Sequence, residues 1–302
     1  MHGRLKVRTT EEQKKRKREE ERRKLGIYQA GVAKVLSTRN VNEYNEEIFI
    51  LTANLLVSNP DIYTMWNVRK ETLLYLEKNR AEDEFCNILD NEVKLTEQCL
   101  LANPKSYGSW YHRYWVLKLH PHADWPKELA LCTKYLTMDD RNFHCWDYRR
   151  LLISHVGVPK ADELHFSSEC LKNNFSNYSA WHYRSTLLDL DADSVNVELK
   201  LVQDATFTDP SDTSAWFYLN WIINNPAATK DALEIQLDAI DQLVDLEPDS
   251  KWALMMRWAL LRILKDTEHN DKEGSLCLEK LIELDPMRAE RYKDLKKIIT
   301  AE

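Results

Sequence analysis

Glycine and proline are both scarce in this sequence. The 302 residues contain only 6 Gly and 9 Pro. All-β folds use these two residues at their many turns, so the scarcity argues for long helices joined by short loops. The chain also lacks any apolar run near the roughly 18 residues that would span a bilayer, and its six cysteines form no CxxC pair. We therefore expect an all-α, cytoplasmic chain with reduced thiols and no membrane insertion.

Charge is unevenly distributed along the chain. Residues 1–24 hold 11 Lys/Arg and 5 Glu, whereas the remainder carries a net charge of −13. A nucleic-acid-binding domain usually presents a basic face, so the acidic body argues against nucleic acid as a partner. Within residues 11–24, Glu precedes Lys or Arg by four positions several times, the order that stabilises a solvated helix. We predict a charged lead-in helix at 1–40 and a repeat domain at 41–302, with a nucleic-acid-binding arm as the alternative for the basic segment.

Tryptophan recurs at a nearly fixed interval through the rest of the chain. Successive members of this series are 44, 36, 35, 35 and 36 residues apart, at Trp66, Trp110, Trp146, Trp181, Trp216 and Trp252. An Asn-Pro or Asp-Pro dipeptide precedes several of them, and Asp285-Pro286 precedes Tyr292 at the same offset. Self-similarity at such a period is typical of stacked repeats. Tyr292 is therefore predicted to take the tryptophan position of a seventh unit.

Each unit is predicted to contain two helices. An apolar-periodic stretch such as 47–57 comes first and ends at the dipeptide, because a residue before proline is pushed out of the helical region. The second helix carries the tryptophan, and in the second unit Trp110, Arg113, Tyr114 and Leu117 fall on one helical face. One such hairpin cannot bury its apolar face alone. Stacked hairpins can, which predicts a solenoid.

An arginine follows the tryptophan by three positions in four of the units. Arginine is almost never buried without a partner, so a purely apolar core does not account for it. The pattern predicts either an ion-pair or hydrogen-bond network between units or a polar groove shared with another molecule. The four residues are Arg69, Arg113, Arg149 and Arg184, and the next two units have Leu219 and Met255 instead.

A second recurring position lies five residues before each tryptophan, at the start of the second helix. It is basic in only two units, as Lys105 and Arg141, and Tyr107 follows Lys105 by two residues. Backbone N–H groups and the helix dipole make a helix N-terminus a natural anion site. A lysine and a tyrosine hydroxyl there could hold a phosphate oxygen. The alternative is that Lys105 is simply a solvated lysine.

The repeated motif resembles that of the protein prenyltransferase alpha subunits. Asn/Asp-Pro, a short gap, an aromatic residue and then Trp-x-x-Arg recur in register from about residue 45 to 300. Within that family the chain is most similar to the type II subgroup, which acts on Rab GTPases. The similarity lies in the opening segment 1–7 and in segments 103–113, 141–150 and 174–184. The resemblance implies a right-handed, crescent-shaped superhelix of about seven helical hairpins.

The family also implies chemistry that these residues alone do not show. It implies an obligate heterodimer with a beta subunit that binds the catalytic zinc and geranylgeranyl diphosphate, while this chain binds no cofactor by itself. Lys105 and Tyr107 then take catalytic roles, and Lys105 and Arg141 bind the diphosphate. His2 is a possible extra ligand to the partner's zinc. The expected beta-subunit interface comprises Arg69, Trp110, His112, Arg113, Trp146, Tyr148, Arg149, Trp181, Tyr183 and Arg184.

Other functions stay open at this point. A Rab escort protein and a Rab GTPase are the further partners implied for the type II subgroup. The alternatives are the alpha subunit of a farnesyl or type I geranylgeranyl transferase, a tetratricopeptide-like interaction scaffold, and an RNA-processing repeat protein. The tetratricopeptide period is close, but its Trp-Leu-Gly-Tyr signature is absent and its repeat does not require the arginine.

Overall fold

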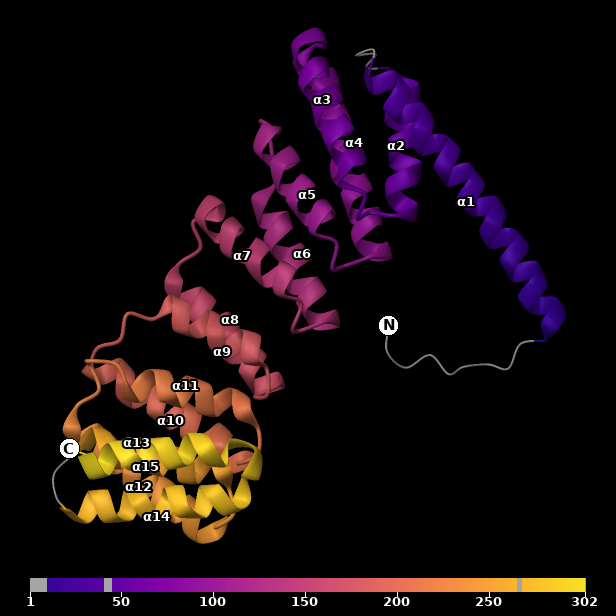
Figure 1. The fold of residues 1–302 in the computed structure, drawn as a ribbon. Coiled ribbons are helices and arrows are strands. Elements are labelled where there is room, and N and C mark those ends of the chain that lie inside the picture. The colour runs from indigo at the N-terminus through magenta and orange to yellow at the C-terminus, as the bar shows by residue number, and fades with distance from the viewer. Residues whose placement is uncertain (1–9, 41–44, 265–267, 302) are drawn as a thin grey trace. The chain divides into compact units, whose positions relative to one another are not determined.

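The computed structural model describes residues 10–40, 45–264 and 268–301. Within these residues the chain forms fifteen α-helices and one short 3₁₀ helix, and no strand (Figure 1). The prediction of an all-α chain is confirmed.

The helices follow one another with short connections. In chain order they are α1 (Glu11–Asn40), α2 (Glu46–Ser58), α3 (Tyr63–Asn79), α4 (Glu82–Ala102), α5 (Tyr107–Leu119), α6 (Trp125–Met138), α7 (Phe143–Val156), α8 (Lys160–Asn173), α9 (Tyr178–Leu187), α10 (Ala192–Thr208), α11 (Thr213–Ile223), α12 (Lys230–Leu246), α13 (Lys251–Leu264), α14 (Glu268–Leu284), η1 (Pro286–Arg288) and α15 (Ala289–Ala301).

From α2 onward the helices pack as sequential hairpins, each made of two consecutive helices. The pairs α2/α3, α4/α5, α8/α9, α10/α11, α12/α13 and α14/α15 are in contact, and Tyr148 of α7 bonds Glu128 of α6. The described residues thus contain the seven predicted hairpins. They divide into two compact units. The first contains the residues up to Tyr135 together with Asp147–Val156. The second contains Leu136–Trp146 together with the residues from Gly157 onward.

The Asn and Asp residues before proline end the first helix of a hairpin, as predicted. Asn59, Asn103 and Asp209 each leave the helical conformation, and each donates its backbone N–H to the carbonyl four residues earlier. Their side chains then accept the backbone N–H two residues further on, at 3.3, 3.1 and 2.9 Å. Such local side-chain bonds offer the backbone an alternative to the helix. The motif therefore acts as a stop signal and as a turn.

Tyr292 takes the tryptophan position of the last hairpin. It is 6% exposed and packs in a cluster with Leu254, Trp258 and Leu281, from α13 and α14. Its hydroxyl donates to Asp285 at 3.0 Å. This placement confirms the predicted seventh unit.

The helix α1 differs from the others because most of it is solvated. All side chains from Glu11 to Ile27 are exposed, and its one fully buried residue is Val35. Val35 packs with Leu55 and Leu56 of α2, so the helix joins the first hairpin only near its C-terminal end. The domain boundary at residue 40 stays a prediction.

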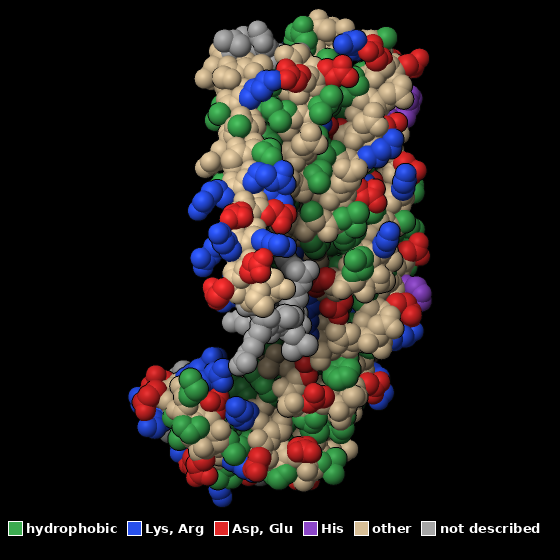
Figure 2. All heavy atoms as spheres, turned by 90° about the vertical axis from the view of Figure 1, so that its right-hand side faces the viewer, with side chains coloured by type: hydrophobic (Ala, Val, Ile, Leu, Met, Phe, Trp, Pro, Cys, Tyr) green, Lys and Arg blue, Asp and Glu red, His purple; other side chains and the backbone are tan. Residues whose placement is uncertain are grey.

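Charge is mixed on the face of the molecule shown in Figure 2, where Lys/Arg and Asp/Glu side chains alternate. Such mixing is a poor match for a phosphate backbone, which needs contiguous basic contacts. Among the described residues, no helix combines the length and the apolar character needed to cross a membrane.

Candidate functional site

In five of the six repeats with a tryptophan, that tryptophan holds the turn that precedes its own helix. Its indole N–H donates to a backbone carbonyl six residues earlier, at distances of 2.7 to 3.0 Å. The side chains themselves are at most 4% exposed. A buried indole needs such an acceptor, so these residues act in the core and in the turn together. The five pairs are Trp66–Pro60, Trp110–Pro104, Trp146–Asp140, Trp181–Phe175 and Trp216–Pro210.

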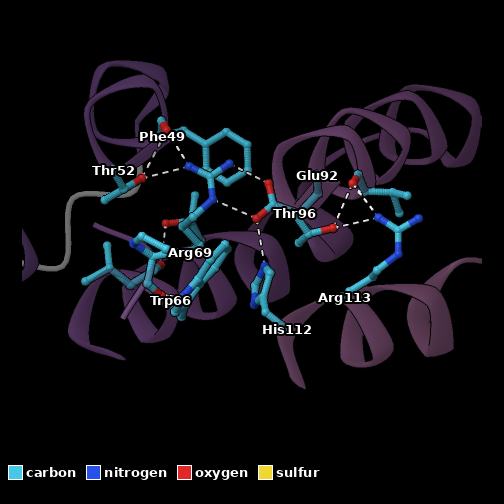
Figure 3. Close-up of polar contacts among 12 residues, drawn as sticks. Phe49, Thr52, Trp66, Arg69, Glu92, Thr96, His112 and Arg113 are labelled. Carbon is cyan, nitrogen blue, oxygen red and sulfur yellow. Dashed lines mark hydrogen bonds and ion pairs between the residues drawn. The ribbon is translucent and has the colours of Figure 1, made fainter. Parts of the chain in front are cut away.

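The repeated arginine ties three helices together. Arg69 of α3 forms a two-pronged ion pair with Glu92 of α4, and it also donates to the Phe49 carbonyl and, at 2.8 Å, to Thr52 Oγ1 of α2 (Figure 3). Its side chain is 3% exposed and that of Glu92 is fully buried. A planar guanidinium suits this geometry because its donors form a rigid fork.

The arginine thus pairs with a buried glutamate of the next hairpin and also bonds the first helix of its own hairpin, an arrangement that we call a clamp. The same clamp recurs in later hairpins. Arg113 of α5 reaches both oxygens of Glu128 of α6 at 2.6 Å, and it bonds Thr96 Oγ1 of α4 at 2.9 Å. Arg184 of α9 likewise reaches both oxygens of Glu198 of α10 at 2.7 Å. The network alternative is therefore confirmed for Arg69, Arg113 and Arg184.

The clamp of Arg149 is seen in part. Its guanidinium, on α7, donates to Thr133 Oγ1 of α6 at 3.1 Å. This bond corresponds to those from Arg69 to Thr52 and from Arg113 to Thr96. All four arginines of the pattern therefore contact the first helix of their own hairpin.

Each acceptor glutamate also receives a bond from the residue two places after the next tryptophan. His112 contacts Glu92 at 2.7 Å, while tyrosine hydroxyls donate to Glu128, Glu163 and Glu198 at 3.0, 2.6 and 2.7 Å. The three donors are Tyr148, Tyr183 and Tyr218. Glu92, Glu128 and Glu198 each lie on the first helix of a hairpin and thus join the second helices of their own and the preceding hairpin.

Burial and charge shift the pKa values in this network. Burial alone would raise the pKa of Glu92, but the charge and hydrogen bonds of Arg69, with His112, lower it to about 2. Burial lowers the pKa of the His112 imidazole, against the opposing effect of Glu92. Burial raises the pKa of Tyr148 and Tyr218, as does the charge of the neighbouring glutamate. Glu92 is therefore charged, and the His112, Tyr148 and Tyr218 side chains are neutral, near pH 7.

The glutamates are the residues that the sequence reasoning missed. Glu92, Glu128, Glu163 and Glu198 are spaced by 36, 35 and 35 residues, and each lies eighteen residues before a tryptophan of the series. The repeat period itself was the available signal. It was hidden because each glutamate lies on the helix before the one that carries the tryptophan.

The residues predicted to bind a diphosphate lie on exposed turns. Lys105 directly precedes Ser106, whose hydroxyl caps α5 by accepting the Ser109 N–H at 3.3 Å. Tyr107 is the first residue of α5, and both Lys105 and Tyr107 are exposed. Arg141 occupies the equivalent turn before α7 and donates to the Ser176 carbonyl at 2.9 Å. Lys105 and Tyr107 share the first compact unit, and Arg141 belongs to the second.

The ten residues predicted for the beta-subunit interface are all buried, and their described contacts lie within the chain. A role at an interface stays a prediction for them. Because these side chains are buried, they would position the helices that meet a partner without touching the partner themselves. The aromatic residues three places before four of the tryptophans are exposed instead, at Tyr63, Tyr107, Phe143 and Tyr178.

The predicted ligand to the partner's zinc is His2. His2 lies outside the described residues. Among residues 10–40, 45–264 and 268–301, no group of three or more His, Cys, Asp or Glu side chains is arranged to hold a metal ion. The described side chains therefore do not fit a zinc site.

Stacked helical hairpins joined by buried Arg–Glu–Tyr contacts define this chain as an α-helical repeat protein. Comparison with known proteins makes the class specific. Residues 89–120, 125–156, 161–191 and 195–226 match the model of the protein prenyltransferase alpha subunit repeat. These segments contain Glu92, Glu128, Glu163 and Glu198 near their starts.

Curated relatives agree with this match. The chain is 46% identical over 176 residues to the geranylgeranyl transferase type-2 subunit alpha of Bos taurus and that of Homo sapiens, covering 58% of this chain and 31% of each relative. It is 35% identical over 164 residues to the Dictyostelium discoideum protein of the same description, covering 54% of this chain and 53% of that one. The chain thus matches about a third to a half of the length of these relatives.

A solved structure has the same fold. A chain of Candida albicans protein geranylgeranyltransferase-I complexed with GGPP superimposes with a TM-score of 0.73 and 23% identity, covering 90% of both chains. This likeness concerns the fold. The repeat match and the curated relatives place the chain in the protein prenyltransferase alpha subunit family.

Proposed function

We propose that this chain is the alpha subunit of a heterodimeric Rab geranylgeranyltransferase, which transfers a geranylgeranyl group from geranylgeranyl diphosphate to C-terminal cysteines of Rab GTPases. The observation that carries the proposal is the 46% identity to type-2 alpha subunits over 176 residues. The Dictyostelium discoideum relative of the same description, 35% identical over 164 residues, supports the type II assignment as well.

The proposed task of the chain is to hold a catalytic beta subunit. The buried clamps support this role, because each one joins three helices and limits the ways in which neighbouring hairpins can pack. A partner would then meet a preformed surface, which reduces the ordering cost of association. In this proposal the zinc, which activates the acceptor thiol, is bound by the beta subunit.

Lys105, Tyr107 and Arg141 are the residues of this chain that we propose to face the diphosphate. Lys105 supplies an ammonium charge, and the Tyr107 hydroxyl supplies a hydrogen bond to a phosphate oxygen. Arg141 supplies a guanidinium of matching charge, of which one donor already bonds the Ser176 carbonyl. Such groups stabilise the charge that develops on a leaving diphosphate. Docking of a Rab escort protein on this subunit belongs to the same proposal and rests on the resemblance alone.

Co-expression tests the proposal. The full chain would be produced with a Rab-type beta subunit and, separately, with a farnesyl-type beta subunit, and the mass of each complex measured by light scattering after gel filtration. A one-to-one complex with the Rab-type partner alone, active in transferring a geranylgeranyl group to a Rab GTPase, supports the type II assignment. Assembly with only the farnesyl-type partner would assign the chain to the type I class. A folded monomer that binds neither partner would leave the interaction-scaffold alternative.

A further inference from the structure

Two of the Trp-bearing helices carry an unusual pair of aromatic residues. Aromatic side chains occupy both the first and the fifth position after the tryptophan in only two of the six Trp units. In α5 they are Tyr111 and Trp115, and in α11 they are Phe217 and Trp221. The two helices therefore carry aromatic rings at the same two positions.

The rings are arranged alike in the two places. In the first compact unit, Trp66 lies 4.5 Å from the His112 ring, and His112 lies 5.7 Å from Trp115, between ring centroids. In the second unit, the corresponding distances are 4.7 Å from Trp181 to Tyr218 and 5.2 Å from Tyr218 to Trp221. The chain thus contains two similar sets of rings, which we call aromatic walls. The first wall consists of Trp66, Tyr111, His112 and Trp115, and the second consists of Trp181, Phe217, Tyr218 and Trp221.

The first wall is occupied by a cation from the chain itself. Lys70, four residues after Trp66, places its ammonium 4.2 Å from the centroid of the Tyr111 ring and 5.4 Å from that of the Trp115 ring. Both distances fall within the range at which an ammonium is attracted to the negative face of a ring. Burial against these rings lowers the pKa of Lys70.

The second wall has no lysine at the equivalent position. Ser185 stands four residues after Trp181, and its hydroxyl turns back to donate to the His182 carbonyl at 2.7 Å. A groove of about 450 Å³ is present there, which we name the α9–α11 groove. Phe217 at its edge remains 56% exposed. The groove is lined by Tyr178, Trp181, His182, Ser185, Ser214, Phe217, Tyr218 and Trp221.

We propose that the α9–α11 groove binds a lysine or arginine side chain presented by a partner protein. The chain's own first unit supplies the template, because a lysine side chain already fills the equivalent place there. The charge of the chain, −7 at pH 7, adds a general attraction for a basic partner segment. An apolar side chain would fit the rings but would not use their negative faces. This inference does not depend on the enzymatic role proposed above.

Indole N–H signals of the full, ¹⁵N-labelled chain provide the first test. Three otherwise identical glycine-flanked peptides would be titrated, with lysine, arginine or uncharged norleucine at the centre. We expect saturable shifts of the Trp221 signal, assigned through Trp221→Phe, with a lysine or arginine peptide binding about fivefold more tightly than the norleucine peptide. Equal binding of all three, or no response of Trp221, would overturn the proposal.

Two matched variants test the template directly. Ser185→Lys supplies the cation from within, so it is expected to abolish the peptide response of Trp221. It is also expected to raise the melting temperature by about 1–2 °C over the uncharged Ser185→Met. Lys70→Ser empties the first wall, so the Trp115 signal is expected to respond to the lysine peptide only in that variant. A Ser185→Lys chain no more stable than Ser185→Met, or one that still binds the peptide, would contradict the proposal.

Discussion

The imidazole of His112 contacts the carboxylate of Glu92 at 2.7 Å in the place where later hairpins use a tyrosine hydroxyl. His112 is fully buried, and among the described residues its Nδ1 has no hydrogen-bond partner. The contact to Glu92 is therefore made by an imidazole, which titrates, whereas the contacts to the other three glutamates are made by tyrosine hydroxyls. The stability of the first hairpins should consequently depend on pH in a way that the stability of the later hairpins does not.

Protonation of His112 should destabilise the fold. Burial lowers its pKa below the ordinary value, so the unfolded chain takes up this proton more readily and stability falls as the pH drops through about 6.5. We expect His112→Tyr to flatten the loss of unfolding free energy between pH 7 and pH 5, measured by urea denaturation. The exposed loop variant His122→Tyr is the control and should leave the slope unchanged. An identical slope for His112→Tyr and the unaltered chain would refute this account.

Glu92 acts in a lower pH range. Its pKa of about 2 in the folded chain lies below the ordinary value of about 4.3, so its contribution is present above about pH 4 and disappears as the pH falls toward 2. Glu92→Gln should therefore destabilise the chain at pH 7 and make little difference near pH 2. Equal destabilisation at both pH values would show that the charge of Glu92 is not what matters.

Breaking one clamp should be costly. Arg113→Met leaves the buried carboxylate of Glu128 without its cation, and loss of one partner of a buried ion pair typically costs about 3–5 kcal/mol. The exposed pair Arg80–Glu84, at 2.8 Å, provides the control, since Arg80→Met should cost at most about 1 kcal/mol. Chemical denaturation measures both. The double variant Arg113→Met/Glu128→Leu should recover part of the loss, and its failure to do so would point to packing rather than to the unpaired charge.

Gly108 is required by a close approach between helices. A Cβ added there would lie 2.7 Å from Nε1 of Trp66 and 3.2 Å from the Pro60 carbonyl oxygen, the two groups that form the first tryptophan hydrogen bond. We expect Gly108→Ala to cost about 1–3 kcal/mol. At Gly26, in the exposed part of α1, a Cβ would meet nothing within 4 Å, and Gly26→Ala should add about 0.5–1 kcal/mol. Thermal melts of the two variants should therefore shift in opposite directions.

Under the proposed function, Lys105 should affect transfer without affecting assembly. Lys105→Ala in the complex with a Rab-type beta subunit is expected to lower kcat/KM for the isoprenoid diphosphate about 10- to 100-fold, the value of a charged hydrogen bond. Lys127, one of two exposed lysines of α6, gives the matched control, Lys127→Ala, which should retain full activity. Gel filtration should show intact complexes for both. Unchanged kinetics for Lys105→Ala would remove this residue from the diphosphate site.

Much of the fold could be predicted because its signals are local. The spacing of the tryptophans and the Asn-Pro and Asp-Pro dipeptides act within one hairpin, so the sequence places both helices and the turn between them. The role of the arginines could be predicted only in part. Their position indicated a polar partner, but the choice between an internal network and a shared groove depended on Glu92, Glu128 and Glu198, which lie on a different hairpin.

The candidate site shows the same limit. Lys105 and Tyr107 were placed on one turn by their two-residue spacing, and the structure keeps them there at the start of α5. The α9–α11 groove could not be predicted, because Ser185 and Phe217 come from different hairpins. Only their packing shows that one aromatic wall holds Lys70 while the other is open.

By itself, the sequence determined that this chain is a series of helical hairpins, most of them with a tryptophan and several with an Asn-Pro or Asp-Pro turn signal, because these features depend on neighbours a few residues away. Tertiary structure decided which carboxylate meets each arginine and why His112 is buried beside Glu92. It also decided where an aromatic wall lacks its cation. These outcomes depend on contacts between one hairpin and the next, and such contacts form only when the helices stack and exclude water.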